Sequence, residues 1–152
     1  MNPFSEPATQ EPANPLADVT LDELAEPLRA AVARAGWPSL MPVQARALPY
    51  LLAGRNVMIQ ARTGSGKTGA FLLPMIQRLD PSKNRCQALI LTPTRELASQ
   101  VWHEAQTICG GAGLRTVAVY GGVGYGAQTE ALKGGAHIVV GTPGRLCDHI
   151  RR

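Results

Sequence analysis

The chain has 152 residues, of which 45% are hydrophobic and only 5% are aromatic, and its formal net charge is +4. This length suits one compact domain or part of a larger one, and the composition is that of an ordinary globular protein. No stretch approaches the roughly 18 apolar residues of a membrane span, and the N-terminus lacks the pattern of a signal peptide. The composition therefore argues against a membrane-spanning protein.

The charge is unevenly distributed along the chain. Residues 1–18 hold three acids and no base (−3), whereas residues 19–152 hold all fifteen bases and the other eight acids (+7). Twelve of the bases are arginine, a planar multi-donor cation suited to phosphate, so the basic part favours a polyanion such as nucleic acid. Simple solubility is the alternative explanation of this charge.

The cysteines Cys86, Cys109 and Cys147 are far apart and form no C-x-x-C pair. This spacing favours reduced thiols in a cytoplasmic protein over a disulfide framework or a zinc site. The first 18 residues include Pro3, Pro7, Pro12 and Pro15. We therefore predict a disordered, acidic tail over 1–18 and a folded part over 19–152.

From residue 19 onward, helical and strand-like patterns alternate. Helices are predicted from Pro27 to Gly36 and over 43–53, 67–79, 95–109, 128–133 and 144–152, and strands over 56–60, 87–92, 116–120 and 137–140. Four apolar strands alternating with helices predict an α/β fold, a parallel sheet with helices on both faces. The loops beyond the carboxyl ends of such strands share one rim, where ligands bind.

The first of these loops, A-R-T-G-S-G-K-T (Ala61–Thr68), follows a predicted strand and opens a helix. It departs from the phosphate-loop pattern G-x-x-x-x-G-K-[ST] only at its first position. Gly64 and Gly66 allow backbone N–H groups to converge on phosphate oxygens at a helix N-terminus. Lys67 would neutralise the outer phosphates, and the Thr68 hydroxyl would bind Mg²⁺. A glycine-rich connecting turn is the alternative interpretation.

Two further motifs follow in order, P-T-R-E-L-A at 93–98 and T-P-G-R at 142–145. Together with the phosphate loop they make residues 19–152 resemble the N-terminal part of the first RecA-like domain of DEAD-box ATP-dependent RNA helicases. The run V-Y-G-G-V-G-Y-G-A-Q-T-E-A-L at 119–132 is most similar to the heat-resistant RNA-dependent ATPase branch. The resemblance implies a P-loop NTPase fold, ATP and Mg²⁺ as cofactors and RNA as partner.

The resemblance also implies a set of nucleotide-binding residues, with Lys67 and Thr68 as the catalytic ones and Thr68 as the Mg²⁺ ligand. The set comprises Trp37, Gln44, Arg62, Thr63, Gly64, Ser65, Gly66, Lys67 and Thr68. The Gln44 amide can donate and accept at once, as the adenine edge requires. Trp37 would stack on the ring, and a core-capping indole is its alternative role.

The adenine-reading element departs from the family pattern at two places. Val19 stands where the family usually has an aromatic residue, and Leu40 and Met41 replace a Pro-Thr or Pro-Ser pair. Phosphate binding is therefore better supported by the sequence than adenine discrimination is.

The other three loops resemble the RNA-backbone contacts of the family, which fall on Thr94, Arg95, Gly121, Gly122, Thr142, Gly144 and Arg145. Small residues let the RNA strand approach, hydroxyls bond phosphate or 2′-OH, and arginine supplies charge, so binding should tolerate any sequence. Each motif has a purely structural alternative: an ion pair for Arg95, a turn for Gly121–Gly122, and a solvated helix position for Arg145.

The acidic motif that names the family follows T-P-G-R on the next strand, and the sequence contains no D-E-A-D or D-E-x-H run. That motif supplies a carboxylate for Mg²⁺ and a glutamate that orients the attacking water. A second RecA-like domain is expected in the parent protein. We thus expect this chain alone neither to hydrolyse ATP efficiently nor to unwind a duplex, and to leave a sheet edge and apolar faces exposed. A non-catalytic nucleotide- or RNA-binding fragment and another superfamily 2 helicase-like translocase are the alternatives.

Overall fold

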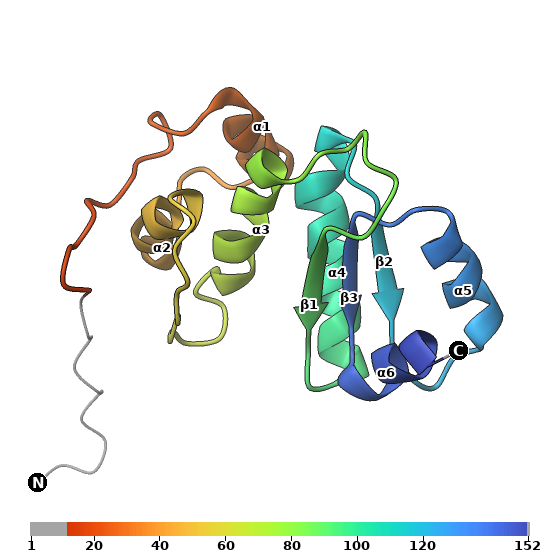
Figure 1. The fold of residues 1–152 in the computed structure, drawn as a ribbon. Helices are drawn as coiled ribbons and strands as arrows, with labels where there is room; N and C mark the ends of the chain where they lie inside the picture. Colours follow the sequence, from red (N-terminus) through yellow and green to blue (C-terminus); the bar gives the residue numbers. More distant parts are fainter. Residues whose placement is uncertain (1–11, 152) are drawn as a thin grey trace, which may run out of the picture.

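The structure is a computed structural model that describes residues 12–151 (Figure 1). Its helices and strands alternate along the chain, as expected for an α/β fold. They are α1 (Glu26–Arg34), α2 (Pro42–Leu52), α3 (Lys67–Arg78), β1 (Ala88–Leu91), α4 (Arg95–Cys109), the short 3₁₀ helix η1 (Gly110–Ala112), β2 (Thr116–Val119), α5 (Tyr125–Lys133), β3 (Ile138–Gly141) and α6 (Pro143–Arg151). None of the helices within 12–151 combines the length and apolarity needed to cross a membrane.

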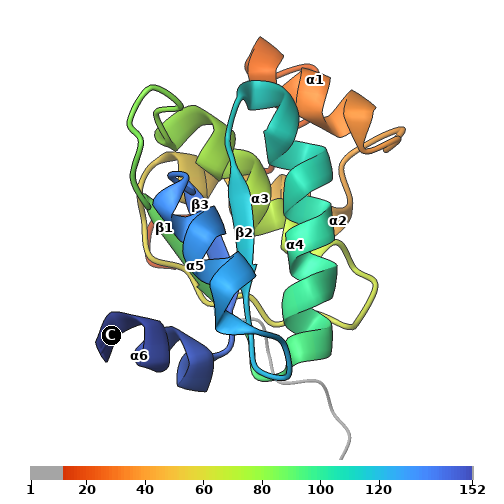
Figure 2. The same cartoon turned by 90° about the vertical axis from the view of Figure 1, so that its right-hand side faces the viewer.

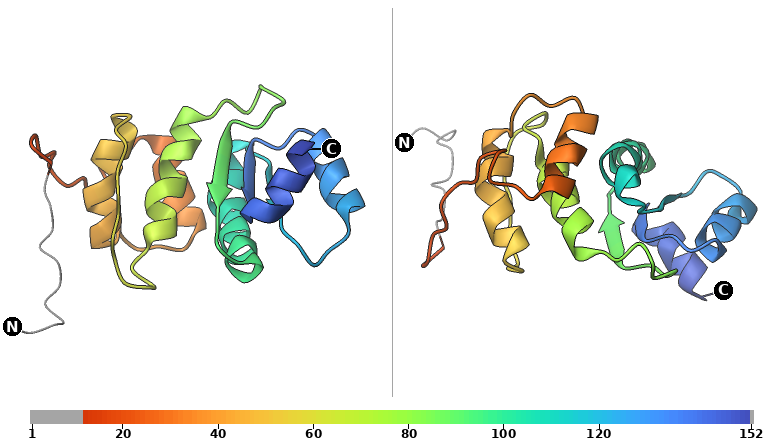
Figure 3. Two further views of the ribbon diagram at one scale, coloured as in Figure 1. Left: turned by 60° about the horizontal axis from the view of Figure 1, so that its bottom comes forward. Right: turned by 90° about the horizontal axis from the view of Figure 1, so that it is seen from above.

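The three strands form a parallel sheet in the order β1-β3-β2, which confirms the predicted sheet type. All four residues of the central strand β3 are buried, as its run of apolar residues predicts for a strand covered on both faces. Ile138 and Val140 face a core shared with α1, α3 and α4, whereas Val139 packs with Leu146 of α6 and Leu132 of α5. Figure 2 and Figure 3 show α4 on one face of the sheet and α5 and α6 on the other.

The strand predicted over 56–60 is wrong. This segment has no regular secondary structure, Met58 is fully exposed and Val57 is 38% exposed. An apolar run makes a strand favourable only when a neighbouring strand takes up its backbone hydrogen bonds, and no strand of residues 12–151 lies beside it. The β1 edge that faces away from β3 is likewise unpaired in this part of the chain, with Leu89 and Leu91 more than half exposed. The exposed edge and apolar side chains expected from the sequence are thus present.

The main core joins helices α1, α3 and α4 to one face of the sheet. Buried Leu72, Leu73 and Ile76 recur along α3 at the spacing of one helix face, and they meet Val101 and Ile108 of α4. In Figure 1 the helices α1, α2 and α3 lie beside the β1 edge, and the turn that opens α3 lies on the side to which the strands point. The core therefore brings the phosphate loop to the predicted rim even though its preceding strand is absent.

The segment before α1 lies against α2 where the structure describes it. The Leu16 N–H donates to the Tyr50 hydroxyl (2.8 Å), and Arg55 donates to the carbonyl of Asn14 (3.1 Å). Residues 12–18 form no helix or strand. The rest of the predicted tail, residues 1–11, lies outside the described residues, and the boundary at residue 18 stays a prediction.

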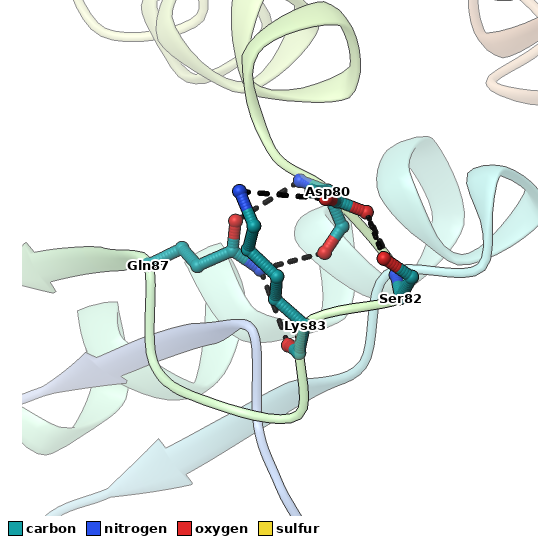
Figure 4. A network of polar contacts seen from close by, with 4 residues as sticks. All are labelled: Asp80, Ser82, Lys83 and Gln87. Atoms are coloured by element: carbon teal, nitrogen blue, oxygen red, sulfur yellow. Dashed lines mark hydrogen bonds and ion pairs between the residues drawn. The ribbon is translucent and has the colours of Figure 1, made fainter.

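The loop from α3 to β1 is closed by a polar network at the opposite end of the strands from the rim (Figure 4). The Gln87 amide accepts from the Asp80 N–H (3.0 Å) and donates to the Asp80 carbonyl (2.7 Å), while Ser82 donates twice to the Asp80 carboxylate. The two hydrogen bonds from Ser82 lower the pKa of the Asp80 carboxyl below its ordinary value. The Asp80 carboxylate also pairs with Lys83 (3.5 Å), so the network joins the segment that follows α3 to the residue that precedes β1.

Candidate functional site

The phosphate loop reaches α3 through two glycines in left-handed conformation. Gly64 has φ +79° and Gly66, the N-cap of α3, has φ +89°. A Cβ atom at Gly66 would lie 2.7 Å from the Met41 sulfur and 2.8 Å from Gln44 Nε2, whereas one at Gly64 would meet nothing within 4 Å. Both positions therefore favour glycine for backbone reasons, and position 66 also requires it for space.

The side chains of the loop leave one buried polar atom without a partner. Lys67 Nζ donates to the carbonyl oxygens of Ala61 and Arg62, the latter at 2.6 Å, so the ammonium group lies against the loop backbone. The Ser65 hydroxyl is buried, and no hydrogen-bond partner lies near it in the described chain. Buried hydroxyls nearly always have partners, so the Ser65 hydroxyl is an exception within residues 12–151.

Helix α2 closes the first turn of α3 through Gln44. Its Oε1 accepts from the Met41 N–H (2.9 Å), its Nε2 donates to the Gly66 carbonyl (3.1 Å), and the side chain is fully buried. The Trp37 ring approaches Gly69 so closely that a Cβ there would lie 2.4 Å from Cη2 of the indole. The indole is half-buried and packs against the main core, which is the core-capping role considered as the alternative for Trp37.

A cavity of about 760 Å³ lies between the start of α3 and helix α4. Its walls include Thr63, Lys67 and Thr68 on the loop side, Trp37 and Gln44 beyond them, and a face of α4. The polar α4 residues that line it and that the sequence analysis missed are Gln100, His103, Glu104 and Thr107. They occupy the polar face of an amphipathic helix, which the sequence pattern cannot distinguish from an ordinary solvated face.

The loop after β1 (residues 92–94) caps helix α4, which begins at Arg95. The Thr94 hydroxyl accepts from the Leu97 N–H (3.2 Å), the hydrogen bond of an N-cap. Arg95 Nε lies 2.6 Å from a Glu96 oxygen, with both side chains about two-thirds exposed. This hydrogen bond raises the pKa of Arg95 and lowers that of Glu96. The ion pair considered for Arg95 is thus present, and its exposure leaves the pair little stabilising value.

The loops after β1 and β2 come together at Gly122. This residue has φ +84°, and a Cβ atom on it would lie 2.9 Å from Arg95 Nη1. Gly121 has open space around it, as does Gly144 at the start of α6. The two loops therefore offer backbone that a ligand can approach closely, beside an exposed guanidinium group.

Thr142, which follows β3, and the first turn of α6 are tied to the loop after β2. The Thr142 N–H donates to the Val119 carbonyl (3.0 Å), and Arg145 Nη1 donates to the Val123 carbonyl (2.9 Å). The Arg145 guanidinium also stacks over the Tyr125 ring at 4.0 Å from its centroid. Arg145 is accordingly half-buried, and it is not the simple solvated helix residue considered from the sequence.

The three strand-end loops thus lie on one rim, with the phosphate loop on the same side of the molecule (Figure 1). A comparison with protein-family models matches residues 41–152 to the DEAD/DEAH box helicase family. The chain belongs to this family. Within residues 12–151 no group of three or more His, Cys, Asp or Glu side chains could hold a metal ion.

The curated relatives and the solved structure that resemble this chain are also DEAD-box proteins. The chain is 50% identical over 131 residues to the ATP-dependent RNA helicase DeaD of Escherichia coli strain K12, covering 85% of this chain and 21% of that protein. It is 44% identical over 130 residues to the DEAD-box ATP-dependent RNA helicase CshA of Bacillus licheniformis, covering 86% and 27%. The crystal structure of a DEAD box protein from Methanococcus jannaschii superposes with a TM-score of 0.81 at 38% identity, covering 90% of this chain and 38% of that one. The chain therefore spans between a fifth and two-fifths of these proteins.

Proposed function

We propose that residues 19–152 are the ATP- and RNA-binding N-terminal portion of the first RecA-like domain of an ATP-dependent DEAD-box RNA helicase. The observation that carries the proposal is the phosphate loop: two left-handed glycines, a lysine folded onto the loop and a buried Ser65 hydroxyl without a partner, all at the start of helix α3. The N-terminus of a helix favours anions through its free N–H groups and its dipole. The loop is therefore suited to the phosphates of a nucleotide.

The chemistry of the loop assigns a role to each of its residues. The backbone N–H groups over 62–66 would surround the phosphates, and the Ser65 hydroxyl would gain the partner that it lacks. Lys67 would leave the two loop carbonyls for the outer phosphates and neutralise their charge. Thr68 would bind Mg²⁺, which usually keeps several waters and takes its other ligands from the phosphates, so it needs no cage of carboxylates.

Gln44 and Trp37 could bind adenine only after a local rearrangement, because the Gln44 amide is already engaged within the protein. Gln44 already uses one end of its amide on Met41 and the other on Gly66, and it is fully buried. It retains one N–H and one lone pair, but because the side chain is fully buried, an adenine ring can reach them only after a local movement of the chain. In the structure Gln44 therefore links α2 to the phosphate loop, and it would contact adenine only in a rearranged state.

The three strand-end loops would bind the RNA backbone. Arg95 supplies an exposed charge beside Gly121 and Gly122, where backbone can approach closely, and Thr94 and Thr142 supply polar groups at the ends of β1 and β3. Contacts of this type read phosphate and ribose and carry no base code. We therefore propose sequence-tolerant binding of single-stranded RNA, to which Gly144 and Arg145 contribute from α6.

The intact protein would use these sites for ATP hydrolysis coupled to RNA remodelling, together with a second RecA-like domain. Hydrolysis requires a metal-binding carboxylate and a residue that orients the attacking water, and neither the D-E-A-D nor the D-E-x-H run that supplies them in the family occurs in the 152 residues. Cys86, Cys109 and Cys147 are free thiols, which suits a reducing compartment, and we propose the cytoplasm.

Binding of a fluorescein-labelled single-stranded RNA, followed by anisotropy over a range of salt concentrations, tests the RNA part of the proposal. Arg95→Ala should weaken binding equally for different RNA sequences and lower the slope of log affinity against log salt by about 0.7, the value for one phosphate contact on a single strand. The matched control is Arg29→Ala, which removes an exposed arginine paired with Glu26 on α1. Equal effects of the two substitutions would show that the rim is not used.

A further inference from the structure

Gln128 is a buried polar residue that the nucleotide and RNA assignments leave without a role. It lies on α5 and is 6% exposed, although a glutamine on a short surface helix is ordinarily solvated. Its Nε2 donates to the carbonyl of Tyr120 (2.9 Å), the last residue before the Gly121–Gly122 pair. Its Oε1 lies 3.3 Å from Arg145 Nη1 and 3.2 Å from His149 Nε2. One side chain thus joins the end of β2 to two residues of α6.

The contacts of Arg145 complete this connection. The same Nη1 atom that faces Gln128 donates to the Val123 carbonyl (2.9 Å), beyond the glycine pair. Gln128 and Arg145 therefore hold the backbone on both sides of Gly121–Gly122. The Tyr125 ring supports the guanidinium from below at 4.0 Å, and the Tyr125 hydroxyl donates to Asp148 of α6 (2.8 Å).

Only an amide fits this position. The side chain must donate toward a backbone carbonyl and accept from two side-chain donors at the same time, which glutamine can do and glutamate or methionine cannot. Gln128 is the buried centre of this partly buried network, which is rigid when all members have partners, and each member depends on the others. The arrangement therefore fixes Arg145 and the glycine loop relative to each other before any ligand arrives.

We propose that Gln128 is a positioning residue for RNA binding, which holds the Gly121–Gly122 loop and Arg145 as one preorganised surface without itself touching the RNA. The inference rests on the proposed RNA-binding function of these loops. Preorganisation raises affinity because the ordering cost is met in the free protein. Loss of the Gln128 contacts should therefore weaken RNA binding through Arg145 and leave the phosphate loop unaffected.

The test combines substitutions in a double-mutant cycle, with anisotropy of a labelled 12-nucleotide single-stranded RNA as the readout. Gln128→Met keeps the length of the side chain and removes all three polar contacts, and we expect it to raise the Kd for RNA about tenfold, the equivalent of ~1.4 kcal/mol. Arg145→Ala should weaken RNA binding directly. If Gln128 acts through Arg145, the double variant should bind RNA no more weakly than Arg145→Ala alone.

Gln128→Glu tests the contacts of the amide nitrogen separately from those of the amide oxygen. It retains the acceptors for Arg145 and His149, loses the donation to Tyr120, and should fall between wild type and Gln128→Met in RNA affinity. Binding of a fluorescent ATP analogue should be the same for wild type and all Gln128 variants, which shows that the variants are folded.

The outcomes separate this inference from the function on which it rests. Nucleotide binding without RNA binding by the wild-type chain would refute the RNA function and this inference together. RNA binding by wild type that Gln128→Met leaves unchanged would refute the inference alone, as would strictly additive effects of the Gln128 and Arg145 substitutions.

Discussion

Alanine substitutions at Gly64 and Gly66 should lower the free energy of unfolding by different amounts, because only the Cβ at position 66 would clash with neighbouring side chains. Both Gly64 and Gly66 have positive φ, so an alanine at either position costs about 1–2 kcal/mol of backbone strain. At Gly66 the new Cβ would also lie 2.7 Å from the Met41 sulfur and 2.8 Å from Gln44 Nε2. The amide of Gln44 is held at both ends and buried, so it cannot move aside cheaply.

The overpacking adds about 1–3 kcal/mol, which brings the total at Gly66 to about 2–5 kcal/mol. For a chain of this size, each kcal/mol lowers the unfolding midpoint by about 2–4 °C. Gly64→Ala should therefore lower the midpoint by about 2–8 °C, and Gly66→Ala by about 4–20 °C. The midpoints are measured by circular dichroism without nucleotide, so that ligand binding does not contribute.

Gly126→Ala is the matched control, since it places a methyl group on α5 in open space with no positive φ. It should leave the midpoint unchanged or raise it slightly, because alanine favours helix over glycine. Equal midpoints for Gly64→Ala and Gly66→Ala would refute the close packing of α2 on the loop.

Two further predictions concern groups outside the loop. Thr94→Ala removes the N-cap of α4 and should destabilise the fold by about 1 kcal/mol, or roughly 2–4 °C in the thermal midpoint, whereas Thr94→Ser should retain the cap. Burial raises the pKa of the Cys109 thiol from 9.0 to about 12. A thiol reagent at pH 8 should therefore modify the exposed Cys86 and Cys147 in the folded protein and reach Cys109 only after unfolding; rapid reaction of all three would contradict the burial. Between these two pKa values the folded chain keeps the thiol proton and the unfolded chain loses it. The contribution of Cys109 to the free energy of unfolding is therefore complete below pH 9 and is lost as the pH rises toward 12.

Local sequence patterns were sufficient for most of the fold. The apolar runs over 87–92, 116–120 and 137–140 all form strands, and α4 covers the predicted residues 95–109. The run over 56–60 also has three consecutive apolar residues, but it has no neighbouring strand in residues 12–151. Strand formation there depends on a pairing partner elsewhere in the chain, which a local pattern does not contain.

In the candidate site too, the sequence predicts what lies within one local segment, whereas contacts between distant segments require the structure. The glycines and lysine of the phosphate loop are adjacent in sequence, so their spacing alone indicates a phosphate site. The network around Gln128 of α5 joins residues 120 and 123 of the loop after β2 to residues 145 and 149 of α6, and only the folded chain brings them together. Likewise, the sequence could suggest that Gln44 reads adenine, whereas the structure was needed to show that its amide is already held by backbone.

The central claim is that the loop at the start of α3 holds the phosphates of ATP, and titration with a fluorescent ATP analogue in the presence of Mg²⁺ tests it most directly. Lys67→Ala should weaken binding at least about tenfold, since it removes the charge that we propose neutralises the outer phosphates. The matched control is Lys133→Ala, which removes an exposed lysine paired with Glu130 at the end of α5 and should bind like wild type. Equal affinity of wild type and Lys67→Ala would contradict the account.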